Sequence, residues 1–187
     1  MVHQALAEGA RLTPVRDMSA VRVLAALTNA AQEVQSRDRA FDLEIIRWAR
    51  PPGSRQRDGV HVDAYPREAV RTEPYFAQRD YARGRPWGER PAYPEYGHTG
   101  LVALLTTPSD GRREWICAGQ ALQRCLLQAS AYEVSAAFHT QALEMYHLRE
   151  FLRQEICAGE YPQMIIRFGF VFETGPGVRR PAAETLE

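Results

Sequence analysis

The side chains best suited to chemistry are scattered along this sequence and form no compact motif. No stretch matches a glycine-rich nucleotide-binding pattern, the H-E-x-x-H zinc pattern or the G-x-S-x-G nucleophile pattern. The five histidines include no pair at i, i+4 spacing and no C-x-x-C accompanies them, which argues against a metal site. All 23 basic residues are arginine, so Schiff-base lysine chemistry is excluded.

Arginine and aromatic residues alternate between Arg71 and Tyr96. Such a composition can bind nucleic acid through phosphate contacts and base stacking. Asp80 and Glu89 dilute the charge of this segment, and over the whole chain 23 acidic residues cancel 23 basic ones. A neutral chain has no net field that attracts nucleic acid or an anionic membrane. We therefore expect no nucleic-acid partner and no membrane partner.

The three cysteines, Cys117, Cys125 and Cys157, form an odd set that argues against a disulfide framework. Cys117 and Cys125 fall on one predicted helix, ~12 Å apart at the helical rise per residue. That separation is too long for a disulfide. We expect all three to be small buried hydrophobic residues.

The composition is that of one globular domain, with 187 residues, 45% hydrophobic and 25% charged. The longest apolar run, Leu101–Leu105, is short against the ~20 residues of a membrane span. The first residues, Met1 to Gln4, lack the basic and apolar regions of a signal peptide. These features predict a cytoplasmic protein.

The elements that would position any site fall into three zones of a single domain, 1–187. In the first zone, 1–50, we expect a short strand at 10–15, a helix capped by Ser19, and a second helix that Pro51 ends. The second zone, 51–99, is irregular and holds seven of the twelve prolines. It also holds seven aromatic residues, which disordered segments rarely carry. We expect it to be a lid-like segment that packs over something.

The third zone, 100–187, alternates strands and helices before a C-terminal tail, which predicts an α+β sheet flanked by helices. The long helix is apolar on nearly all sides, so we expect it to be a buried central helix. Whether it lies in the core of one domain or in a subunit interface stays open, with the core favoured. The candidate strands are 100–106, 134–138 and 163–170, and the candidate helices are 110–132 and 144–156.

Three patterns follow one another between Leu104 and Leu186: W-x-x-A-G-Q-A-L-Q-R beginning at Trp115, the Tyr161-Pro162-Gln163 start of the last strand, and the Arg179-Arg180-Pro181 tail. In this order and spacing the stretch resembles the C-terminal part of the FMN-dependent nitroreductase family, and looks most like its actinobacterial Acg-type branch. The first-zone helices and the Asp58-Gly59-Val60 turn also suit that branch.

The resemblance implies an α+β flavoprotein with a nitroreductase-like antiparallel or mixed sheet, which passes a hydride from NAD(P)H through FMN to a nitroaromatic or quinone-type small-molecule acceptor. It implies FMN binding at a subunit interface, and hence a homodimer or a partner chain. By the same resemblance, His139, Thr140 and Gln141 line the isoalloxazine ring, and Arg179, with Arg180 beside it, reaches the phosphate. Arginine suits a dianionic phosphate. Ordinary loop residues and solvated tail charges remain the alternative.

Two departures from the family pattern favour a second interpretation. By comparison with the family pattern, we expect the chain to lack the N-terminal half of the family fold, with its phosphate-binding segment. Glu133 also stands where the helix-ending turn usually has a glycine, which reaches positive φ without strain. The alternative function is therefore a non-catalytic remnant that sequesters flavin or associates with another protein.

Overall fold

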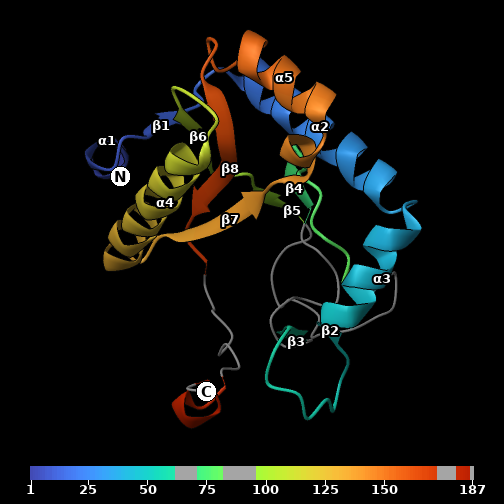
Figure 1. Ribbon diagram of the computed structural model, residues 1–187. Helices are drawn as coiled ribbons and strands as arrows, with labels where there is room; N and C mark the ends of the chain where they lie inside the picture. Colours follow the sequence, from blue (N-terminus) through green and yellow to red (C-terminus); the bar gives the residue numbers. More distant parts are fainter. Residues whose placement is uncertain (62–70, 82–95, 172–179, 186–187) are drawn as a thin grey trace.

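The computed structural model describes residues 1–61, 71–81, 96–171 and 180–185 (Figure 1). Its centre is a four-stranded antiparallel sheet with the strand order β1-β6-β8-β7. Helices cover both faces of this sheet, which confirms the expected α+β class. The strands are β1 (Arg11–Pro14), β6 (Leu101–Thr107), β7 (Ser135–His139) and β8 (Tyr161–Gly169).

The central strand β6 is buried on both faces, as its uninterrupted apolar sequence predicts. Ala103 and Leu105 face α1 (Val2–Ala7) and α4 (Arg112–Ala131). Val102 and Leu104 face the opposite core, under α2 (Met18–Gln35) and α5 (Tyr146–Glu155). Figure 1 shows these two helical layers on either side of the sheet.

The N-terminus of α2 lies two residues earlier than the sequence analysis expects. Asp17, not Ser19, is the N-cap, because its carboxylate accepts hydrogen bonds from the backbone N–H groups of Ser19 and Ala20 at 3.1 and 3.2 Å. An aspartate at this position also complements the positive end of the helix dipole. The expected cap was wrong, although the helix itself is present.

The irregular zone follows α3 (Arg39–Trp48) and contains two small parallel ribbons. One pairs β2 (Ala49–Arg50) with β3 (Val60–His61), and the other pairs β4 (Arg71–Glu73) with β5 (Tyr96–His98). Two parts of the expected lid, 62–70 and 82–95, lie outside the described residues. The lid therefore stays a prediction.

The outer side of α4 is exposed, contrary to the expectation of a helix buried on most sides. Ala118, Ala121, Cys125 and Ala129 pack on the sheet. No described residue covers its outer side, so Ile116 and Leu127 stay exposed, by 65% and 62%. Cys117 is only half-buried, whereas Cys125 and Cys157 are buried as expected, and all three thiols are free.

The turn between α4 and β7 has the backbone geometry that the sequence predicts. Glu133 adopts a φ of 56°, in the left-handed region where glycine is favoured. Its amide donates to the Ser130 carbonyl at 3.0 Å, and the Val134 amide donates to the Ala129 carbonyl at 2.9 Å. These bonds satisfy carbonyl groups at the end of α4.

Candidate functional site

His139 is the last residue of β7 and is almost fully buried, with 2% of its surface exposed. It therefore belongs to the strand and not to the loop that follows it. The guanidinium of Arg167 donates from Nε to His139 Nε2 at 2.8 Å. Because Nε2 must then accept, the proton sits on Nδ1, which donates to the Ala77 carbonyl at 3.2 Å. Burial, assisted by the nearby Arg167 charge, lowers the pKa of His139 to about 4.

Arg167, on the neighbouring strand β8, brings a positive charge into this buried region. Its guanidinium lies 5.3 Å from the centre of the Phe76 ring and donates to Thr72 Oγ1 at 3.2 Å. Burial lowers the pKa of this guanidinium. Within the described part of the chain no carboxylate pairs with it, so neutral acceptors and an aromatic ring surround the charge.

Gln141 reaches the same carbonyl group as His139. Its side chain is 2% exposed and donates from Nε2 to Ala77 O at 3.2 Å and to Gln32 Oε1 at 3.3 Å. It lies in the 3-10 turn η2 (Gln141–Glu144), between β7 and α5. His139 and Gln141 together thus hold the segment around Ala77 against the sheet.

Thr140 points away from that buried pair, toward the surface. Its hydroxyl donates to Glu144 Oε1 at 2.6 Å and accepts from Arg79 Nη2 at 3.1 Å. Arg79 also forms an ion pair with Glu144. The three side chains thus form a polar cluster that joins η2 to Arg79.

The two tail arginines that the sequence analysis selects have different outcomes. Arg179 lies outside the described residues. Arg180 is exposed, and its charge contributes to the low pKa of Asp58, for which the hydrogen bond from Arg50 is the main cause. Asp58 is held by Arg50 at 2.9 and 3.1 Å, near the end of α3. The structure therefore separates the buried pair His139 and Gln141 from Thr140 at the surface, and it places the charge of Arg180 close enough to Asp58 to contribute to its lowered pKa.

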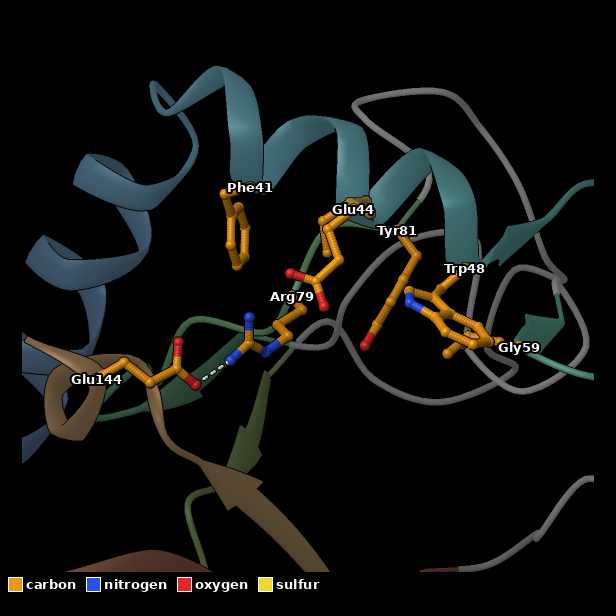
Figure 2. Close-up of a pocket in the computed structure, with 9 residues that line it drawn as sticks. Phe41, Glu44, Trp48, Gly59, Arg79, Tyr81 and Glu144 are labelled. Atoms are coloured by element: carbon orange, nitrogen blue, oxygen red, sulfur yellow. Dashed lines mark hydrogen bonds and ion pairs between the residues drawn. The ribbon is translucent and has the colours of Figure 1, made fainter.

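A groove of about 570 Å³ opens beneath α3 (Figure 2). The side chains of Phe41, Glu44 and Trp48 descend into it from α3, and Arg79 and Tyr81 face them from the opposite side. Glu144 closes one end through its ion pair with Arg79. The sequence analysis named none of these residues as a site, although Phe41 and Trp48 share one helical face.

The sequence analysis also did not select Arg167 as a site residue, although the sequence around it contains a signal. It is the one charged residue in the otherwise apolar and polar-neutral stretch QMIIRFGF that was predicted as a strand. A charge in a strand of the sheet interior is rarely buried unless it has a specific environment. The sequence alone therefore indicates Arg167 as a candidate functional residue.

Two of the three residues expected to line the flavin ring, His139 and Gln141, already have protein partners for their side chains. The donor groups of His139 and Gln141 are directed at Ala77 and the remaining ring nitrogen of His139 accepts from Arg167. Thr140 is the one member of the set 139–141 whose side chain reaches the surface cluster. The described residues contain no group of three or more His, Cys, Asp or Glu side chains that could hold a metal ion. None of the helices in the described ranges has the length and apolarity to cross a bilayer.

No protein-family model matches the sequence, and no curated protein matches it. Among solved structures, the chain is similar to a protein from Desulfovibrio desulfuricans that is assigned as a nitroreductase and was crystallised in complex with FMN. The identity is 24% and the TM-score is 0.38; the match covers 46% of this chain and 52% of that one. This chain thus spans about half the length of the solved protein.

Proposed function

We propose that the chain is an FMN-binding oxidoreductase of the nitroreductase type, which uses NAD(P)H to reduce a nitroaromatic or quinone-type acceptor. The observation that carries the proposal is the ordered sequence pattern from Leu104 to Leu186. Its first two parts correspond to α4 and to the start of β8, which belong to the same sheet and its helical layer. Arg179 of the third part, the tail, lies outside the described residues. A bound flavin would supply the redox chemistry, and the protein would supply binding and orientation.

The proposal assigns flavin contacts to His139, Thr140, Gln141, Arg179 and Arg180. Direct contact through His139 or Gln141 requires the Ala77 carbonyl to leave, because both side chains now donate to it. Segment movement of this kind would couple flavin binding to the irregular zone. Thr140 needs only to exchange its partners Arg79 and Glu144 at the surface.

The test is the visible absorption spectrum of the purified chain after FMN is added and the excess is removed. Flavin bands that survive desalting and weaken in Arg179→Ala, but persist in the control Arg113→Ala, would support the flavin site. Arg113 is an exposed arginine in the first turn of α4. A chain that stays colourless with excess FMN would contradict it. If flavin binds, NAD(P)H oxidation with a quinone acceptor tests the activity separately.

The second candidate function is a non-catalytic protein that associates with another chain or sequesters flavin. The observation that favours it is the engagement of His139 and Gln141 by protein groups, which leaves neither side chain open to a ligand. A colourless chain that co-purifies in a defined complex would favour this candidate over the enzyme.

We also propose that α4 mediates self-association. Its outer side exposes Trp115, Ile116 and Leu127 by 53%, 65% and 62%. Gly119 lies among them with nothing within 4 Å of its Cβ position, so a second backbone could approach closely. Light scattering after size exclusion should give a dimer that Ile116→Glu with Leu127→Glu converts to a monomer. A wild-type monomer at micromolar concentration would refute this interface.

A further inference from the structure

The groove beneath α3 combines three aromatic side chains with unbalanced acidic charge. Phe41, Trp48 and Tyr81 supply the rings. Among the described lining residues, Glu44 and Glu144 supply two carboxylates and Arg79 supplies the single cation. These described residues therefore carry a formal net charge of −1.

The Arg79 guanidinium has other partners and forms no ion pair with Glu44 among the described residues. It pairs with Glu144, donates to Thr140 Oγ1 at 3.1 Å, and lies 5.2 Å from the centre of the Phe41 ring. Within the described part of the chain, Glu44 has no ion pair and no hydrogen bond to its carboxylate. Figure 2 shows this carboxylate pointing into the groove.

The aromatic walls can accept a positive charge as well as apolar surface. An aromatic face attracts a cation within about 6 Å of the ring centre. The chain itself uses this interaction nearby, since the guanidinium of Arg47, which does not line the groove, lies 5.6 Å from the centre of the Trp48 ring. Trp48 is still 41% exposed. The groove volume of about 570 Å³ is in the range of small-molecule sites.

We propose that this groove binds a small organic cation, whose positive group lies against the Glu44 carboxylate and whose apolar part lies against the Trp48 and Tyr81 rings. The site needs no flavin and no contact from His139 or Gln141. It is therefore independent of the proposed oxidoreductase activity, and the test is made on the chain without FMN.

The experiment compares three probes that share one benzene ring and differ in charge: benzyltrimethylammonium, benzyl alcohol and benzenesulfonate. Binding is measured by calorimetry on the full chain, and tryptophan fluorescence reports the position. We expect saturable binding of the cation at least fivefold tighter than of the alcohol, and weakest binding of the sulfonate. The fluorescence response should disappear in Trp48→Phe.

Glu44→Gln tests the charge contact. It should weaken cation binding at least fivefold and leave the alcohol unaffected, whereas Glu155→Gln, an exposed carboxylate on α5 with the same change in charge, should alter neither. If Glu44→Gln does not fold, a salt series on the unaltered chain replaces it, because only the charged probe should lose affinity as ionic strength rises. Equal binding of cation and alcohol, preference for the sulfonate, no saturable binding, or an unchanged Glu44→Gln would each overturn the proposal.

Discussion

An arginine side chain lies near each end of β8, and the two differ in the kind of group that accepts their hydrogen bonds. At the start of the strand, Arg149 donates to both oxygens of Asp110 at 2.7 and 2.9 Å, and both side chains are partly exposed. At the other end, the buried Arg167 donates to the neutral ring of His139. The partly exposed Arg149 is therefore paired with a carboxylate, whereas the buried Arg167 donates to neutral acceptors. The two regions should therefore respond differently to mutation and to pH.

The largest effect is expected for Arg167→Ala. This change leaves His139 Nε2 and Thr72 Oγ1 without their donor and removes packing against Phe76. We expect a loss of about 3 kcal/mol in the free energy of unfolding, measured by urea denaturation. Arg167→Met, which keeps the volume and removes the cost of a buried charge, should lose less. If the alanine variant loses no more than Asp110→Asn below, the comparison between the two regions fails.

A pH effect of similar size is expected from His139. Its folded pKa of about 4 lies below the ordinary value of 6.5, so the folded state prefers the neutral ring. The resulting stability is complete above pH 6.5 and is lost as the pH falls from there toward 4. The total loss should be about 3 kcal/mol, from the size of the pKa difference.

Urea denaturation between pH 7.5 and 4.5 measures this loss. His139→Gln, which cannot take up the proton, should flatten the profile, whereas the control His147→Gln, at an exposed residue, should keep it. Asp110 contributes little to the change in the free energy of unfolding between pH 7.5 and 4.5. Its pKa is held well below the usual value, first by the hydrogen bonds from Arg149, so its contribution is lost only at more acidic pH. An unchanged profile in His139→Gln would show that other groups cause the acid sensitivity.

Asp110→Asn should have a smaller effect, about 1–2 kcal/mol at neutral pH. The change weakens the paired bonds from Arg149 but keeps an oxygen that can accept from Trp115 Nε1, now at 2.7 Å. Water can also reach the remaining polar groups, because both partners are partly exposed. Thermal or urea unfolding checks this value against Glu155→Gln, for which no change is expected. A loss above that of Arg167→Ala would reverse the ranking.

The smallest effects on the free energy of unfolding are expected at two residues with positive φ, one near each end of β8. Glu133 precedes β7 with φ 56°, and Ala158 precedes β8 with φ 50°. Replacing either by glycine should stabilise the chain by up to about 1 kcal/mol, because the left-handed conformation strains a residue with a Cβ. The gain should be the same at pH 7.5 and 5.

Two further variants separate backbone from side-chain effects in this last prediction. Ala137→Gly, within β7, should destabilise, because glycine in an ordinary strand conformation adds only flexibility. Glu133→Ala should gain nothing. An equal gain from alanine and glycine at 133 would mean that the glutamate side chain, and not φ, sets the cost.

Much of the fold was predictable because its signals are local. The apolar run at 101–105 predicted a strand buried on both faces, and the periodic pattern from Trp115 predicted the long helix. The positive φ at Glu133 agrees with the glycine that the resembled family usually has at this turn. The error on α4 arose because apolar residues on all sides predict burial without saying which neighbour provides it.

The sequence by itself determined the α+β class, the main strands and helices and the strained turn, since each depends on residues within a few positions of one another. Only the tertiary structure decided that His139 and Gln141 bind Ala77, more than 60 residues away, and that Arg167 lies beside a neutral histidine. It also formed the groove, by bringing Arg79 and Glu144 against α3. Such contacts depend on how the sheet aligns its strands and where the long loops close, which local patterns do not encode.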